Sequence, residues 1–395
     1  MVKLTQLKKR VKLAKNTLCC IGIRKSEKQM KKIGKEVAFL LTHDKNPRNG
    51  EGTFARLKDG SILHVFTEYC GESYEDDGIA HLCAVRSTDE GETWSDRHLI
   101  LEKDDGAKNY MSPSLLRLPN GHLGMFFLRK EKKDVDFKFS EEACTCMPAF
   151  CYSADEGKTW SDFVFCIDRD GYFCGINDGI LLQRSGRILM PLSSETEKNI
   201  VIVASDDCGK SWYTLCEPIA LPYPCFKIGL QEPGIYEHEN GELWVYCRTL
   251  LGYQYQSRSS DNGKTWGPVI PNLYFSSPNS PMRVKKVGKY TVSVFNPVSC
   301  TCMKPSTSRR PFVCAVSTDD GMSFNDFIDL ADDVQKMRDF AGHTFFLEDS
   351  LKDTYCYPSI IETNDGFLVA YYHSNGGSYA LRATKITKVY YSEIE

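Results

Sequence analysis

A glutamate and an arginine, Glu232 and Arg248, stand sixteen positions apart on either side of a turn signal. Gly241 lies between them and begins a short apolar run, a pattern that is typical of a hairpin. Such a hairpin places both side chains at the same end of adjacent strands. The planar guanidinium of arginine binds a carboxylate through two parallel hydrogen bonds and stays charged. The pair therefore indicates a site for an acidic group, and its structural alternative is an ion pair that only bridges two strands.

A motif of eight residues recurs five times along the chain. Its form is Ser-x-Asp-x-Gly-x-Thr/Ser-Trp/Phe, and successive copies begin 52 to 66 residues apart. The Ser and Asp oxygens accept hydrogen bonds from nearby backbone N–H groups, the Gly supplies a positive φ, and the aromatic residue anchors the turn. A repeat of this kind predicts an array of similar supersecondary units. The copies are residues 87–94, 153–160, 205–212, 259–266 and 317–324.

A second repeat consists of a turn glycine followed by a mostly apolar strand. Each of its first five copies is followed by one copy of the eight-residue motif. Six units of about four strands predict an all-β fold, a six-bladed β-propeller, over residues 37–395. Because an open array exposes strand edges, we expect residues 37–41 to pair with the run at about 380–391 and close the ring. The turn glycines are Gly60, Gly121, Gly186, Gly241, Gly288 and Gly366.

The eight-residue motif is the Asp-box, and the chain resembles the sialidase (neuraminidase) superfamily of six-bladed propellers with BNR repeats. The Glu232 segment is similar to bacterial sialidases, in which a glutamate precedes a carboxylate-binding arginine by sixteen residues. Tyr357, in Tyr-Cys-Tyr-Pro-Ser, resembles the sialidase nucleophile, although Tyr355 competes for this role and a core tyrosine is the structural alternative. Sialidases use tyrosine because a negative nucleophile would be repelled by the sugar carboxylate. The resemblance implies that Glu232 takes the proton of Tyr357.

The resemblance implies two further arginines that bind the sugar carboxylate. The late one is expected just before the fifth Asp-box, and we assign it to Arg310 from its position in the repeat, with a surface arginine as the alternative. The first is expected before the first turn glycine, within a Phe/Tyr-Arg-Ile-Pro segment. This chain has Asn-Pro-Arg-Asn-Gly-Glu there, so Arg48 is displaced and Glu51 is an additional acid. The departure indicates a divergent bacterial sialidase-like branch.

The resemblance places the general acid in the acidic loop at residues 72–78. Neighbouring carboxylates raise each other's pKa, which keeps one of them protonated for the leaving oxygen. We predict Asp76 in this role and Asp77 as the second choice, with solvated surface acids as the alternative. Three polar residues at corresponding strand starts are expected to bind sugar hydroxyls or to be turn residues: Ser112, Asn177 and Asp178.

Composition excludes several classes of protein. The net charge of −3 offers no general attraction for nucleic acid, and no stretch approaches 18 apolar residues, so we expect no transmembrane helix. Residues 1–36 carry twelve Lys and Arg but no apolar core of a signal peptide. Leu4, Leu7 and Val11 fall on one helical face, which fits a helix at a membrane surface or partner, a solvated helix, or an unstructured arm.

Cysteine usage bears on compartment and metal binding. Seventeen cysteines without a signal peptide predict reduced thiols in the cytoplasm. Two Cys-Thr-Cys pairs, Cys144/Cys146 and Cys300/Cys302, supply four thiols of the kind that bind zinc, but ordinary thiols in loops are the favoured interpretation. We expect no metal and no cofactor.

Together these features predict an exo-acting glycoside hydrolase that releases a terminal acidic sugar, sialic acid, from glycans through a tyrosyl-sugar intermediate. One alternative keeps the fold and changes the chemistry to another glycosidase or a uronate lyase. Another is a non-catalytic carbohydrate-binding propeller, which would not need Tyr357.

Overall fold

The computed structural model describes residues 32–132, 144–222, 229–297, 309–331, 353–375 and 381–395. They belong to one compact unit, Lys32–Glu395. Residues 32–36, expected in the basic extension, are part of this unit, and Ile33 is buried in its core. Residues 1–31 lie outside the described residues. Within the described residues nearly all regular structure is β, and the one helix is α3 (Tyr391–Ile394). The all-β prediction is confirmed.

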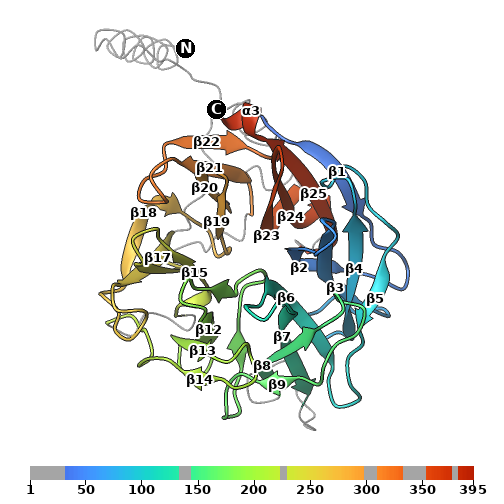
Figure 1. Cartoon of the computed structure of the whole chain (residues 1–395), viewed down its shortest axis with the longest axis horizontal. Coiled ribbons are helices and arrows are strands. Elements are labelled where there is room, and N and C mark those ends of the chain that lie inside the picture. The colour runs from blue at the N-terminus through green and yellow to red at the C-terminus, as the bar shows by residue number, and fades with distance from the viewer. Residues whose placement is uncertain (1–31, 133–143, 223–228, 298–308, 332–352, 376–380) are drawn as a thin grey trace, which may run out of the picture. The chain divides into compact units, whose positions relative to one another are not determined.

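The described strands form five hydrogen-bonded sheets in a propeller-like ring (Figure 1). The largest has eight strands in two antiparallel groups, β2 to β5 and β6 to β9. The groups are joined by one parallel residue pair, Ala80 with Asn109. Its strands are β2 (Asn49–Arg56), β3 (Ile62–Tyr69), β4 (Ala80–Ser87), β5 (His98–Leu101), β6 (Asn109–Arg117), β7 (Leu123–Lys132), β8 (Cys144–Ser153) and β9 (Val164–Phe165).

The next three sheets follow in chain order and are antiparallel. The first contains β10 (Phe173–Cys174), β11 (Leu181–Leu182), β12 (Ile188–Ser194), β13 (Asn199–Ser205) and β14 (Tyr213–Thr214). The second contains β15 (Gln231–Glu237), β16 (Leu243–Arg248), β17 (Tyr253–Ser259) and β18 (Ile270–Ser276). The third contains β19 (Arg283–Val287), β20 (Tyr290–Phe295), β21 (Val313–Ser317) and β22 (Asp326–Asp329).

The last sheet joins the two ends of the described chain. It contains β23 (Asp353–Thr363), β24 (Gly366–Asn375), β25 (Ala383–Tyr390) and β1 (Lys35–Leu40). Strand β1 pairs antiparallel with β25, from Lys35 opposite Lys388 to Leu40 opposite Thr384. The predicted closure by an N-terminal strand is therefore confirmed, and it covers the edge of β25 that would otherwise be unpaired.

The turn glycines are required by backbone conformation at some positions and by space at another. Gly60, Gly121, Gly186 and Gly241 have φ between 84° and 90°, and an added Cβ would meet no atom within 4 Å. Only the positive φ demands glycine at these four hairpins. At Gly366 an added Cβ would lie 1.9 Å from the Val389 carbonyl oxygen, so close approach of β25 excludes a side chain there.

The Asp-boxes are hydrogen-bonded turns, as the residue types predict. In the first box, Ser87 Oγ donates to Asp89 Oδ1 at 2.8 Å and accepts from the Gly91 N–H at 2.8 Å. Asp89 Oδ1 also accepts from the Thr93 N–H at 2.9 Å, and Trp94 Nε1 donates to the Gly91 carbonyl at 3.1 Å. The Ser, Asp and Gly contacts recur in the other four boxes. In each box the Ser and Asp oxygens bond within the box itself, so these residues shape a turn.

We expect Asp207→Ala to lower the free energy of unfolding by about 1–2 kcal/mol, because Asp207 accepts two hydrogen bonds from Ser211 and one from Ser205. Urea unfolding measures the change. Lys210→Ala, at an exposed position of the same turn, is the matched control. Equal stability of the two variants would contradict this account of the box.

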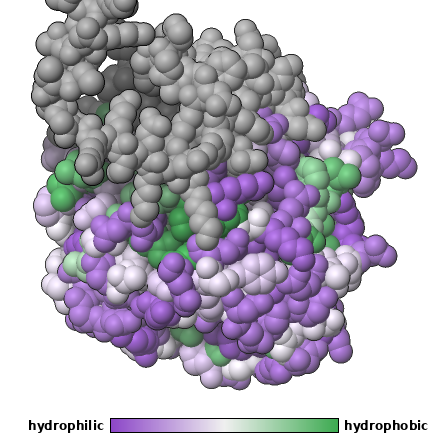
Figure 2. Space-filling model, turned by 90° about the horizontal axis from the view of Figure 1, so that it is seen from above, coloured by the Kyte–Doolittle hydropathy of each residue, from purple (hydrophilic) through white to green (hydrophobic). Residues whose placement is uncertain are grey.

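The core lies between neighbouring sheets. Phe126 and Phe150 of the eight-stranded sheet pack against Ile188 and Met190 of the next sheet, and all four are buried. Gly209 of the third box lies against Phe150, where an added Cβ would come within 2.0 Å of the ring. Figure 2 shows that hydrophilic residues dominate the visible described surface and that hydrophobic residues form separate patches. The described part of the chain contains no helix long and apolar enough to cross a membrane.

Candidate active site

Four centre-facing strands carry a β-bulge at corresponding points. The register shifts fall at residues 50–53 in β2, 111–114 in β6, 231–234 in β15 and 356–359 in β23. A bulge changes the direction of a side chain, and positive φ is costly for residues other than glycine. At these four bulges a positive φ occurs at Glu51 (φ 52°), Ser112 (51°), Glu232 (44°) and Tyr357 (54°). Asp178, just before β11, also has a positive φ, 57°.

Tyr357 is buried and forms a hydrogen-bonded group with Glu232 and Arg248, whose side chains are 12% and 11% exposed. The Tyr357 hydroxyl donates to Glu232 Oε1 at 2.6 Å, and Arg248 Nη1 lies 2.8 Å from Glu232 Oε2. Arg248 Nη1 also donates to the Tyr357 hydroxyl at 3.2 Å. Gln231 lies opposite Arg248 in the β15–β16 hairpin, so the predicted hairpin is confirmed. Among the described residues, Nε of Arg248 has no hydrogen-bond acceptor.

Burial sets the protonation of this group. It raises the pKa of Glu232 above 4.5, and the attraction of Arg248 and the hydrogen bond from Tyr357 offset only part of this effect. Burial also raises the pKa of Tyr357 well above 10, and the charge of Glu232 adds to the shift. Tyr357 is therefore a neutral phenol in contact with a carboxylate of increased basicity, which is an arrangement suited to proton transfer.

The arginine that contacts Tyr357 from the segment before the fifth Asp-box is Arg309. Its guanidinium carbon lies 5.4 Å from the centre of the Tyr357 ring, and Nη1 donates to Cys356 Sγ at 3.1 Å. The Arg309 carbonyl accepts from the Tyr355 N–H at 2.9 Å, which ties this segment to β23. The sequence prediction chose the adjacent Arg310, which is partly buried.

Arg48 is fully buried and binds carboxylates of the protein itself. Nη2 donates to Glu51 Oε1 and Nη1 to Asp76 Oδ1, both at 2.6 Å, and Nε donates to the Tyr372 hydroxyl at 2.8 Å. The guanidinium also lies 4.5 Å from the centre of the Tyr69 ring. From the sequence, Glu51 was recognised only as an additional acid near Arg48. The spacing of residues along the chain did not predict that Tyr372 or Tyr69 would contact Arg48.

Asp76, the predicted general acid, is half-exposed in the loop after β3. Loss of hydration to the surrounding protein opposes the ionisation of Asp76, but the charges of Arg48 and Lys130 and the Arg48 hydrogen bond outweigh this and lower its pKa to about 2. Its backbone carbonyl accepts from Asn109 Nδ2 at 3.0 Å and Lys130 Nζ at 2.9 Å, which fixes the loop against β6 and β7. Asp77 is partly buried next to it.

The three predicted hydroxyl-binding residues are buried and bonded within the protein. Ser112 Oγ donates to Glu51 Oε2 at 2.6 Å. Asn177 Nδ2 donates to the Gly52 carbonyl at 2.7 Å and to the Tyr357 carbonyl at 3.3 Å. Asp178 accepts from Thr53 Oγ1 at 3.1 Å and from the Ile360 N–H at 3.2 Å. In this arrangement they connect the centre-facing strands and support the bulges.

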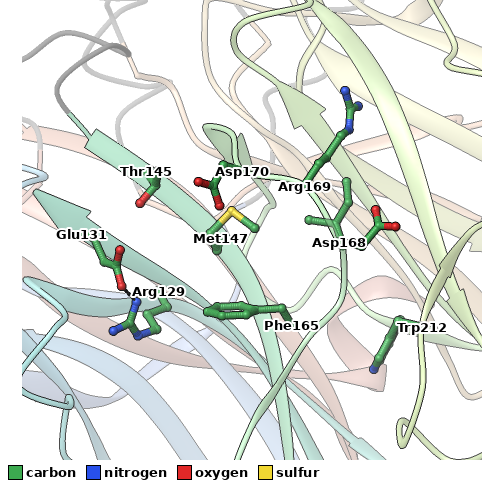
Figure 3. A pocket seen from close by; sticks show the side chains of 10 residues that line it. Arg129, Glu131, Thr145, Met147, Phe165, Asp168, Arg169, Asp170 and Trp212 are labelled. Atoms are coloured by element: carbon green, nitrogen blue, oxygen red, sulfur yellow. Dashed lines mark hydrogen bonds and ion pairs between the residues drawn. The ribbon is translucent and has the colours of Figure 1, made fainter. Parts of the chain in front are cut away.

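Two cavities lie away from this group. One of about 350 Å³ is drawn in Figure 3, where Arg129 and Glu131 point toward each other beside Met147 and Phe165. Arg129 pairs with Asp104 and Glu131 there, so its charge is already compensated. The other, of about 590 Å³, is lined by residues three to five positions beyond the bulges, such as 54–56 in β2. Neither is lined by Tyr357, Glu232 or Arg248.

No group of three or more His, Cys, Asp or Glu within the described residues is arranged to hold a metal ion. Cys144 and Cys146 are buried in β8, and burial raises the pKa of Cys146 to about 11, which disfavours the thiolate that zinc needs. Cys300 and Cys302 lie outside the described residues.

The fold and the repeats define an all-β, BNR-type propeller protein, and the comparisons with known proteins agree. Residues 64–370 match the BNR repeat-like domain, and the chain belongs to this family. The chain is 31% identical over 134 residues to the anhydrosialidase of Macrobdella decora, an alignment that covers 31% of this chain and 16% of that protein.

Solved sialidase structures share the fold at low sequence identity. The NanB sialidase of Streptococcus pneumoniae superposes with a TM-score of 0.66 at 12% identity, over 91% of this chain and 71% of that one. The intramolecular trans-sialidase of Ruminococcus gnavus gives 0.63 at 15% identity, over 90% and 97% of the two chains. These likenesses show that the chain shares the propeller fold of the solved sialidases.

Proposed function

We propose that this protein is an exo-acting glycoside hydrolase that releases a terminal acidic sugar, sialic acid, with Tyr357 as nucleophile and Glu232 as its general base. The observation that supports this most is the 2.6 Å hydrogen bond from the buried Tyr357 hydroxyl to Glu232, with Arg248 in contact with both. A phenol paired with a base and flanked by cations is suited to attack a carbon that bears a carboxylate.

In the proposed reaction, Arg248 and Arg309 hold the sugar carboxylate beside Tyr357. Glu232 takes the phenol proton as the tyrosine oxygen bonds to the anomeric carbon, while the bond from that carbon to the leaving oxygen breaks. The leaving oxygen takes a proton from a solvent water and departs. A second water then bonds to the anomeric carbon and passes a proton to the hydroxide left in solvent. The bond from that carbon to the tyrosine oxygen breaks and Glu232 returns its proton to that oxygen, so two inversions retain the configuration.

We also infer six blades from the sheets. The eight-stranded sheet divides into two four-stranded antiparallel groups that share one parallel residue pair. Counted as two blades beside the four other sheets, these groups agree with the six turn glycines of the sequence. The cytoplasm remains the proposed compartment, supported by the abundance of cysteine.

The role of Asp76 is testable through the leaving group. If Asp76 protonates the leaving oxygen, Asp76→Asn will slow hydrolysis of an alkyl sialoside by about 10²-fold but spare an aryl sialoside whose phenolate leaves without help. Asp77→Asn is the matched control. Arg48 holds Asp76 ionised, with a pKa of about 2. We therefore expect Asp76→Asn to slow hydrolysis of the alkyl and the aryl sialoside equally. That result would indicate that Asp76 positions Arg48. A selective loss with the alkyl substrate would restore the acid role.

The function is tested by incubating the protein with a fluorogenic α-sialoside and following the product by proton NMR. Free sialic acid supports hydrolysis. An anhydro sugar would instead indicate intramolecular transfer, the reaction named for the Ruminococcus gnavus relative. No release by the wild-type protein at high enzyme concentration would reject the assignment.

A glycosidase for another sugar is the second candidate, and the pairing of Arg48 with Glu51 and Asp76 favours it, because one expected carboxylate-binding arginine is already neutralised. A panel of aryl glycosides of neutral sugars and uronic acids, assayed beside the sialoside, separates the two candidates.

A further inference from the structure

Arg48 differs from Arg248 in how completely the protein uses its guanidinium. Arg48 pairs with two carboxylates, Glu51 and Asp76, and its side chain is 1% exposed. Arg248 pairs with one carboxylate, and its Nε has no acceptor among the described residues. The positive charge of Arg48 therefore faces two carboxylates, whereas the positive charge of Arg248 faces one.

We propose that Glu51 is a specificity-determining residue that occupies the carboxylate-binding position of Arg48 and so withdraws this arginine from the substrate. The acidic group of the sugar is then held by Arg248 and Arg309 alone. This inference rests on the proposed function for the identity of the substrate, but the pairing of Glu51 with Arg48 is testable without a sugar.

The surroundings of Glu51 hold it in this position. Its two oxygens accept from different partners: Oε1 from Arg48 and from Tyr372 at 3.4 Å, and Oε2 from Ser112 at 2.6 Å. The side chain is 3% exposed, and the bulge in β2 directs it there with a φ of 52°. A carboxylate with three donors in a buried site does not leave without breaking all three contacts.

An incoming carboxylate faces an energetic barrier at Arg48. To bind there it would have to displace Glu51 or Asp76, and a displaced Glu51 would be a buried charge without its partner, which is strongly destabilising. Arg309 carries no such requirement, because it contacts Tyr357 and Cys356 rather than a carboxylate in the described structure. Arg248 pairs with Glu232 through Nη1, but its Nε has no acceptor among the described residues. The geometry thus divides the arginines into one internal and two substrate-facing members.

The first experiment measures the preference for an acidic over a neutral sugar. Isothermal titration compares sialic acid with its methyl ester, which lacks the charge. We expect Arg48→Gln/Glu51→Gln, which removes the internal pair together, to keep the wild-type preference within about threefold, and Arg248→Gln to reduce it at least about tenfold. A tenfold loss of preference in the double variant would overturn the proposal, because it would show Arg48 binding the substrate carboxylate.

The second experiment needs no sugar and uses acetate as the probe. Glycine fits a φ of 52°, so Glu51→Gly removes the carboxylate without straining the backbone. We expect acetate, exchanged for chloride at constant ionic strength, to raise the thermal midpoint of Glu51→Gly by several degrees by binding Arg48. The wild-type protein should show no such response.

Glu156→Gly is the matched control, because Glu156 also has a positive φ, 64°, and pairs with an arginine, Arg117, but at a partly exposed site. An equal acetate response in Glu156→Gly or in the wild type would reject the assignment of Glu51. If neither the wild type nor any variant binds sialic acid but acetate selectively stabilises Glu51→Gly, sialic acid is rejected as the substrate. The pairing of Glu51 with Arg48 is then still supported.

Discussion

Tyr357→Phe is expected to lower the turnover of a sialoside by at least about 10³-fold while sugar binding changes little. The substitution removes only the hydroxyl group, and in the proposed reaction the oxygen of this group forms the bond to the sugar. The ring, which is packed between Arg309 and Tyr372, stays in place. Steady-state kinetics with titration of sialic acid separates the two effects.

Tyr355→Phe is the control for this substitution. Tyr355 lies two residues earlier in β23, and its ring stacks on His373. We expect this variant to keep its turnover. If Tyr357→Phe retained more than a tenth of wild-type turnover, the nucleophile would have to be another group, and a carboxylate such as Glu51 would be examined first.

Glu232→Gln is expected to cost about 10²–10⁴-fold in turnover, because an amide cannot take the Tyr357 proton. The pH profile carries the sharper prediction. Glu232 acts as a base only when ionised, so activity should fall as the pH drops through its pKa, which burial raises above 4.5. The acid limb of kcat/KM therefore lies above the ordinary range of a glutamate.

The position of that limb should depend on Arg248. This arginine favours the ionised form of Glu232, so Arg248→Met should move the limb of the residual activity to higher pH. Arg117→Met, which removes an arginine from the Glu156 pair, is the control and should leave the limb in place. If the acid limb of kcat/KM did not move in Arg248→Met, a group other than Glu232 would control it.

The features that the sequence predicted correctly are local or repeated. Positive φ demands glycine at Gly60 and Gly241, and the box oxygens bind their own backbone, so residue type alone reports these turns. The Glu232–Arg248 contact follows from one hairpin, whose register is set by the turn at Gly241. Closure by β1 follows from the need to cover an edge.

The features that the sequence did not predict depend on contacts between distant segments. The contact of Arg309 with Tyr357 is set where the Arg309 segment meets β23. The partners of Arg48 come from β2, the loop after β3, and β24, and no spacing rule joins them. The charge of Arg48 then decides the ionisation of Asp76, so the general-acid prediction could not be judged from the acidic loop alone.

A repeated spacing in the sequence marks the residues of the site. Glu51, Ser112, Glu232 and Tyr357 each stand nine residues before a turn glycine, and each is followed by Gly or Pro. The structure shows that these positions are the bulges of the centre-facing strands. Aligning the repeats on the turn glycine would have placed Glu51 in the same structural position as Glu232 and Tyr357.

The most direct test of the central claim is to trap the covalent intermediate. The wild-type protein is incubated with a sialosyl fluoride that carries a second fluorine beside the anomeric carbon, which slows release of the sugar more than its attachment. Peptide mass spectrometry then locates the adduct. We predict one sugar on Tyr357, absent from Tyr357→Phe. An adduct on Glu51 or Glu232, or no adduct while the fluoride is consumed, would contradict the tyrosyl mechanism.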